Sequence, residues 1–158
     1  MSRAYLDHAS TTPLRPEARD ALVDALDRFV GDPGRIHEEG LAARVALEQA
    51  REQVAALVGA RSRSVVFTSG ATEAIATAVA GAAARANDRR TADAAGRTHQ
   101  VVTAVEHSAV RLAAERAGDV TVVPVDAHGR VEADAVLAAV EDRTAAVHVQ
   151  WGNHEVGT

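Results

Sequence analysis

From Ser64 to Gln150, short runs of β-branched residues alternate with alanine-rich stretches that have the composition of helices. Strands that alternate with helices of about 10–15 residues form right-handed βαβ units, and such units build a parallel sheet. The sequence therefore predicts an α/β fold with a mainly parallel sheet flanked by helices. The expected strands are 64–68, 100–105, 120–125 and 145–150, and the expected helices are 72–86, 108–117 and 132–141.

The residues before this alternation predict two helices and no strand. A Gly-Asp-Pro-Gly break separates the two helices, and Gly59 ends the second one. Their expected ranges are 16–30 and 37–58, with Leu41, Val45, Val54 and Leu57 facing inward. We divide the chain into an N-terminal segment, 1–62, and the first part of an α/β domain, 63–158, in which the polar stretch 87–98 forms a loop.

The 158 residues include neither lysine nor cysteine, and all 17 basic residues are arginine. Without cysteine there is no disulfide, no thiol nucleophile and no thiolate metal site, and we expect no metal. Without lysine, no side chain of these residues can form an imine with a carbonyl compound. The net charge of −5 argues against a nucleic-acid-binding surface. No apolar run reaches about 18 residues and no signal peptide is visible, so we expect a cytoplasmic protein without a membrane span.

The stretch Ser64–Ala74 has the pattern of a strand, a turn of small residues and the start of a helix. This arrangement points free backbone N–H groups at an anion, and the helix dipole favours negative charge there. Gly70 lets the backbone approach a ligand, and Ser69 and Thr72 add hydroxyl donors. We call Ser69–Thr72 the anion cup. Small residues at this place are also ordinary turn and cap chemistry, and the stretch alone leaves both interpretations open.

Polar residues follow three of the expected strands. Ligands of an open parallel sheet bind beyond the carboxyl ends of its strands. The anion cup follows the first strand, His107 follows the second, and Asn153 and His154 follow the last. An anion cup, an imidazole and an amide at one edge suit a flat, phosphorylated ring. The structural alternatives are a cap or surface role for His107 and a turn role for Asn153.

The sequence ends in the polar stretch Trp151–Thr158, directly after an expected buried strand. Domain ends usually fall in exposed linkers, whereas this end would leave a sheet edge uncovered. We therefore expect the chain to be cut within a longer domain.

Four stretches of the chain resemble, in the same order, the N-terminal part of a cysteine desulfurase. These enzymes belong to the class V aminotransferase family, whose cofactor is pyridoxal 5′-phosphate (PLP). The resemblance implies the large domain of a fold-type I PLP transferase, truncated, with PLP bound at the sheet edge. The four stretches are Tyr5–Pro13 (YLDHASTTP), Val66–Glu73 (VFTSGATE), Glu106–Val110 (EHSAV) and Asn153–Gly157 (NHEVG).

The resemblance assigns cofactor contacts to individual positions. Ala71, through its backbone N–H, and Thr72 match the family's phosphate-binding positions. His107 matches the histidine that stacks on the pyridine ring and carries protons, so it is the expected catalytic residue. The family's asparagine beside the ring hydroxyl falls at His154, with Asn153 one residue earlier. This is a departure from the family, but a histidine can also donate to a phenolate oxygen, and we expect contacts from both residues.

The early active-site loop departs from the family pattern as well. The family often has Asn-Pro where this chain has Asp32-Pro33. His37 falls near that loop, and it either borders the substrate site or begins a helix.

The resemblance implies an enzyme that converts L-cysteine to L-alanine and leaves the sulfur as a persulfide on an enzyme cysteine. It also implies a sulfur-accepting protein, as in iron–sulfur cluster assembly, and a homodimer. The family's cofactor-binding lysine, substrate-binding arginine and catalytic cysteine belong to later elements that these residues do not include. The chain by itself is therefore expected to be inactive.

Two alternatives to a cysteine desulfurase stay open. The whole protein could belong to another class V branch, such as a selenocysteine lyase, a kynureninase-like hydrolase or an aminotransferase, because the N-terminal motifs are shared. Alternatively, the chain is a non-catalytic remnant that binds a partner, which would cover its sheet edge.

Overall fold

The computed structural model describes residues 4–88 and 98–158. By its internal contacts the chain divides into two compact units, Met1–Phe67 and Thr68–Thr158, and each is described by itself. The division of the sequence at 62/63 stays a prediction. The loop expected at 87–98 lies mostly outside the described residues, and the helix α3 (Ala71–Asp88) includes its first two positions.

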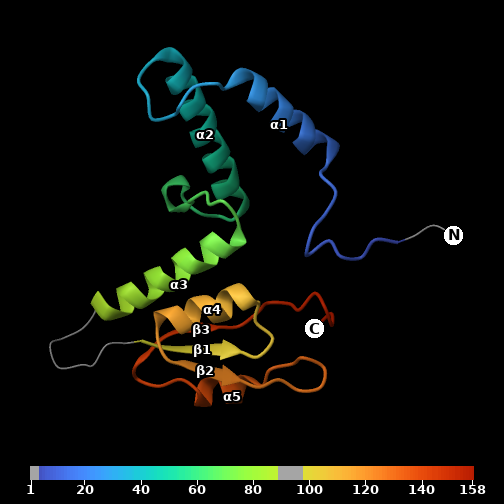
Figure 1. Ribbon diagram of the computed structural model, residues 1–158, viewed down its shortest axis with the longest axis vertical. Coiled ribbons are helices and arrows are strands. Elements are labelled where there is room, and N and C mark those ends of the chain that lie inside the picture. The colour runs from blue at the N-terminus through green and yellow to red at the C-terminus, as the bar shows by residue number, and fades with distance from the viewer. Residues whose placement is uncertain (1–3, 89–97) are drawn as a thin grey trace. The chain divides into compact units, whose positions relative to one another are not determined.

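The second unit is built on a three-stranded parallel sheet (Figure 1). The central strand β1 (His99–Thr103) lies between β2 (Val120–Val123) and β3 (Thr144–His148). All five residues of β1 are buried, and Val101 and Val102 are completely enclosed. This confirms the predicted parallel sheet. In register, Gln100 pairs with Val120 and Ala146, and Val102 pairs with Val122 and His148.

Helices connect the strands and flank the sheet. The helix α4 (Ser108–Ala117) leads from β1 to β2, and α5 (Ala133–Ala138) leads from β2 to β3. Because β2 and β3 lie on opposite sides of β1, right-handed crossovers put these two helices on opposite faces. Figure 1 shows α4 above the sheet and α5 below it. The helix α3 packs against α4 and β3. The α/β architecture with flanking helices is thus confirmed.

The strand predicted at 64–68 is wrong. Ser62–Ser64 form a short 3₁₀ helix, η1, and Val65 is extended but pairs with no strand among the described residues. Its carbonyl oxygen accepts a hydrogen bond of 2.6 Å from Nη1 of Arg51. The same guanidinium lies 5.0 Å from the centre of the Phe67 ring. β-branched residues favour extended backbone, but a strand also needs a neighbour that bonds its N–H and C=O groups.

The first unit contains the two expected helices, α1 (Pro16–Arg28) and α2 (Glu38–Leu57). His37 is the N-cap of α2, because its Nδ1 atom accepts a hydrogen bond of 3.2 Å from the backbone N–H of Gly40. The expected helix-start role of His37 is therefore confirmed, while a place beside the substrate stays a prediction. The expectation that the four apolar residues of α2 face inward is wrong. All four are exposed, since an apolar helix stripe is buried only where a second layer packs on it.

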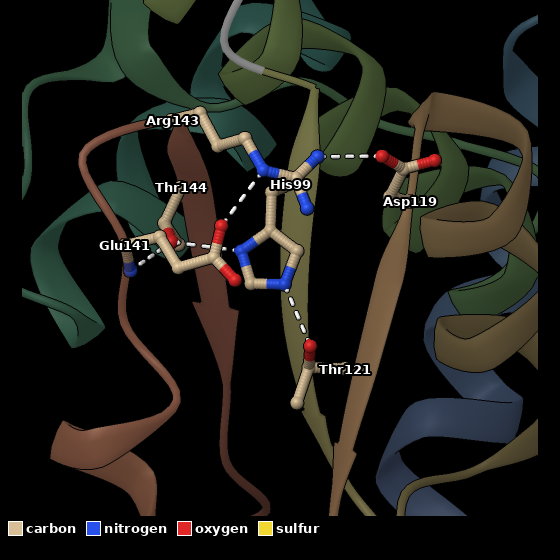
Figure 2. Close-up of polar contacts among 6 residues, drawn as sticks. All are labelled: His99, Asp119, Thr121, Glu141, Arg143 and Thr144. Carbon is tan, nitrogen blue, oxygen red and sulfur yellow. Dashed lines mark hydrogen bonds and ion pairs between the residues drawn. The ribbon is translucent and has the colours of Figure 1, made fainter.

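A buried histidine joins the three strands at the end of the sheet where the strands begin (Figure 2). His99 is 1% exposed, and its Nδ1 atom lies 2.9 Å from the hydroxyl oxygen of Thr144 on β3. Its Nε2 atom lies 2.8 Å from the hydroxyl oxygen of Thr121 on β2. Next to this group, the guanidinium of Arg143 donates to a carboxylate oxygen of Asp119 at 2.5 Å. These contacts fix β2 and β3 to β1 at the edge opposite the expected ligand site.

Candidate functional site

The anion cup forms the N-terminal end of α3. The carboxylate oxygen Oε2 of Glu73 accepts hydrogen bonds from the backbone N–H of Ser69 at 2.7 Å and from its hydroxyl at 2.6 Å. The hydroxyl of Thr68 donates to the carbonyl oxygen of Gly70 at 3.0 Å. The Ser69 hydroxyl, and after it the Ser69 backbone N–H, lower the pKa of Glu73 below its usual value. The turn is thus held by side chains on both sides of Ser69.

The donors of the cup that remain for a ligand belong to the first turn of α3. The first backbone N–H groups of a helix have no acceptor within the helix, and this applies to Ala71 and Thr72. Both residues are exposed, as is the hydroxyl-bearing side chain of Thr72. A Cβ atom built on Gly70 meets no atom within 4 Å, so there is open space over the turn. The first turn of α3 thus presents backbone donors beside open space, which is the arrangement of known anion sites at helix starts.

His107 lies at the start of α4 and caps it. Its Nδ1 atom accepts a hydrogen bond of 3.1 Å from the backbone N–H of Ala109. In a neutral imidazole whose Nδ1 is an acceptor, the proton is on Nε2. The side chain is exposed, so this Nε2–H group is open to a ligand. The cap role of His107, one of the two interpretations of the sequence, is present in the structure and leaves Nε2–H available as a hydrogen-bond donor.

Asn153 forms a turn after β3. Its side-chain oxygen accepts hydrogen bonds from the backbone N–H groups of Glu155 at 2.8 Å and Val156 at 3.1 Å. The turn interpretation of Asn153 is therefore confirmed, and the amide nitrogen is the part of the side chain that can donate to a ligand. His154 is exposed at the same turn.

A cavity of about 400 Å³ lies beyond the carboxyl ends of β1 and β3. Asn153 lines this cavity, whereas Ala71, Thr72 and His107 do not. Figure 1 shows that α3 and α4 both begin on the side to which the arrows of β1 and β2 point. The fold thus brings the expected residues to one side of the sheet without joining them in a single cavity. Other residues lining the cavity include Thr103, Val105, Arg130, Gln150, Trp151 and Thr158.

Glu73 had no predicted role, although it lies in the stretch Val66–Glu73 that resembles the family. An acidic residue in the first turn of a helix is a common feature of helix starts, and this signal could have drawn attention to it. The contact between His148 and Gln100 was not predicted either. The Nε2 atom of His148 lies 3.0 Å from the Oε1 atom of Gln100. Strand periodicity alone does not show which polar residues pair across a sheet.

Within the described ranges 4–88 and 98–158, the structure contains no helix that is long and apolar enough to cross a membrane.

Comparisons with known proteins agree on one family. The model of the family described as aminotransferase class-V matches residues 4–158. A putative cysteine desulfurase IscS 1 of Bacillus subtilis is 38% identical over 158 residues, which are 100% of this chain and 41% of that protein. A cysteine desulfurase of Cereibacter sphaeroides is 41% identical over 161 residues, 100% of this chain and 40% of that protein.

Solved structures show the same relationship. A structure titled NIFS-like protein superposes with a TM-score of 0.85 at 28% identity, over 99% of this chain and 42% of its own. The structure of DndA from Streptomyces lividans superposes with a TM-score of 0.71 at 30% identity, over 91% of this chain and 40% of its own. The chain thus spans about 40% of the length of the relatives it matches.

The parallel sheet, the flanking helices and the anion cup at a helix start define the large domain of a fold-type I PLP transferase, of which part is present. The chain belongs to the class V aminotransferase family.

The residues present fit PLP in part. The open space over Gly70 and the free N–H groups of the first turn of α3 suit its phosphate. His107, with an exposed imidazole whose Nε2–H can donate, suits contact with a flat aromatic ring that bears polar substituents. Covalent attachment of PLP requires a lysine, and these residues include none.

Proposed function

We propose that this chain supplies the phosphate-binding and ring-contacting part of a PLP-dependent cysteine desulfurase. The observation that carries the proposal is the anion cup of α3 in a chain whose whole described length falls within the class V match. Relatives named cysteine desulfurase, at 38% and 41% identity, support this activity over the other class V branches. The proposal includes L-cysteine as substrate, a sulfur-accepting protein, a homodimer and a cytoplasmic location.

In this proposal the backbone N–H groups of Ala71 and Thr72 and the Thr72 hydroxyl bind the phosphate. Charge-assisted hydrogen bonds of this kind are about twice as strong as neutral ones, and the dipole of α3 adds to them. No side chain of the cup brings a formal positive charge. The geometry of the turn therefore determines the strength of phosphate binding.

His107 has two tasks in the proposal. The hydrogen bond from Ala109 to Nδ1 holds the imidazole at the start of α4 and fixes the neutral tautomer with its proton on Nε2. To give a proton from Nε2, the imidazole must take one up at Nδ1, and the ring then releases the Ala109 N–H while it is protonated. Asn153, through its amide nitrogen, and His154, through an imidazole N–H, are the proposed donors to the ring hydroxyl.

When bound, PLP supplies an electron sink for the bonds at the substrate's α-carbon. The lysine that attaches it and the cysteine that receives the sulfur must come from residues beyond these 158, on the same polypeptide or on another.

The test is an assay of the native full-length protein, loaded with PLP, against three substrates. Incubation with L-cysteine is expected to give alanine and protein-bound persulfide in equal amounts. L-Selenocysteine and L-kynurenine are the comparison substrates, because they identify the alternative class V branches. Alanine formed from selenocysteine alone, or anthranilate formed from kynurenine, would replace the proposed reaction. No turnover of any substrate by a PLP-loaded protein would favour the non-catalytic alternative.

A further inference from the structure

The carboxylate of Glu73 accepts hydrogen bonds from both donors of Ser69. This negatively charged group lies beside the proposed site of another anion, the phosphate. One carboxylate oxygen, Oε2, receives the backbone N–H at 2.7 Å and the hydroxyl at 2.6 Å. Neither donor of Ser69 is therefore free for a ligand. The phosphate contacts of the cup are left to Ala71 and Thr72, which follow directly in the sequence.

The contact also fixes the backbone where the chain enters α3. Ser69 is held by Glu73 from inside the helix, and the next residue, Gly70, is held by the Thr68 hydroxyl and by the backbone N–H of Ala74. Gly70 is the residue with the greatest backbone freedom in the turn. With Ser69 and the carbonyl of Gly70 both tied, the N–H groups of the first turn keep one direction before any ligand arrives.

Charge and geometry predict opposite effects of Glu73 on an anion. A carboxylate close to a phosphate repels it, so that its removal alone would tighten binding. A carboxylate that holds the donors in place favours binding, so that its removal would weaken it. The sign of the change in phosphate affinity therefore separates the two roles.

We infer that Glu73 is a positioning residue of the phosphate site, which orders the turn through Ser69 so that Ala71 and Thr72 bind the phosphate of PLP. The inference rests on the proposed function, because it takes the ligand of the cup to be PLP. Glu73 itself makes no contact with the ligand in this account.

The experiment measures the dissociation constants of PLP and of pyridoxal, which lacks the phosphate, for the native full-length protein and its variants. The readout is the ratio of the two constants, which reports the phosphate contacts alone. A general loosening of the site moves both constants together and leaves the ratio unchanged. Thermal unfolding and far-ultraviolet circular dichroism of each variant show that it is folded.

Glu73→Ala is expected to lower the preference for PLP over pyridoxal about tenfold, the loss of roughly one ordered charge-assisted contact. Glu73→Gln keeps an oxygen that accepts from Ser69 and is expected to retain the preference within about threefold. Ser69→Ala removes the hydroxyl and keeps the backbone donor, and its effect is expected to lie between these two. If Glu73→Ala does not fold, the preference of Ser69→Ala for PLP over pyridoxal is compared with that of Glu73→Gln instead. The lower preference is then expected in Ser69→Ala.

An unchanged or increased preference in Glu73→Ala would overturn the inference, since it would leave only the repulsive role. Thr72→Ala separates this failure from failure of the proposed function. If Thr72→Ala abolishes the preference for PLP while Glu73→Ala does not, the phosphate site stands and only the positioning role is wrong. If the unmodified protein does not distinguish PLP from pyridoxal, both proposals fail.

Discussion

The Nε2 atom of His148 on β3 lies 3.0 Å from the Oε1 atom of Gln100 on β1, so that the imidazole N–H donates to an amide oxygen across the sheet. Burial lowers the pKa of His148 below its usual value of 6.5, and the carboxylate of Glu106 partly offsets this. The folded protein therefore keeps the imidazole neutral at a pH where the unfolded chain begins to bind a proton.

This contact predicts that acid destabilises the fold. The unfolded chain binds more protons than the folded one as the pH falls below about 7, so the contribution of neutral His148 is present above 6.5 and lost below it. Urea unfolding at several pH values between 8 and 5 measures the effect. His148→Gln keeps a donor for Gln100 and does not titrate. The difference in unfolding free energy between native protein and variant should fall with pH, and a constant difference would contradict this account.

A pair of glycines predicts opposite effects of the same substitution. A Cβ atom on Gly118, at the end of α4, would lie 1.6 Å from the carbonyl oxygen of Thr98. Gly118→Ala should destabilise the protein by about 3 kcal/mol or more, because the backbone must move. Gly81 lies inside α3 with no atom within 4 Å of an added Cβ, and Gly81→Ala should stabilise by up to about 1 kcal/mol. Melting temperatures that shift in the same direction for both variants would be inconsistent with these surroundings.

The buried His99 predicts a loss of stability that can be divided between its partners. His99→Ala removes a bridge between three strands and leaves a cavity, which should cost about 2–4 kcal/mol of unfolding free energy. Thr121→Val keeps the shape of its side chain and removes one contact. A double-mutant cycle of the two should give a coupling energy of about 0.5–3 kcal/mol. A coupling of zero would show that the 2.8 Å contact does not stabilise the sheet.

The two roles of His107 predict different results for two substitutions. His107→Asn keeps a side-chain acceptor for the start of α4 and should leave stability nearly unchanged, whereas His107→Ala should cost about 0.5–2 kcal/mol. Both remove the Nε2 proton, and both should lower turnover of L-cysteine by the full-length protein about 10²–10⁴-fold. Normal turnover by His107→Asn would mean that the histidine is only a helix cap.

The sequence predicted the α/β architecture because its strongest signals were local. The bounds of α4 follow from residues within it and from Gly118 directly after it, and the structure has those bounds as predicted. The strand at 64–68 failed because its identity depends on a neighbour that no local pattern reveals. The inward-facing residues of α2 failed for a related reason, since burial depends on a second layer.

At the site, the family motifs identified which residues to consider but not how each one is used. The sequence does not indicate that the side-chain oxygen of Asn153 accepts hydrogen bonds within a turn, or that Nδ1 of His107 is an acceptor. Both facts depend on the direction of a side chain within a few ångströms. Glu73 illustrates the reverse case, because an acidic residue in the first turn of the expected helix was visible in the sequence and no role was assigned to it.

The position of β1 between β2 and β3 sets the order in which the sheet can close during synthesis. A ribosome makes the central strand first, and one of its edges gains a partner only when residues 120–123 have emerged. The second edge stays open until residues 144–148 follow, although every residue of β1 is buried in the finished fold. The nascent chain therefore carries the strand that will be most deeply buried with an unpaired edge through the synthesis of α4, β2 and α5, which is the interval in which it is most prone to aggregate.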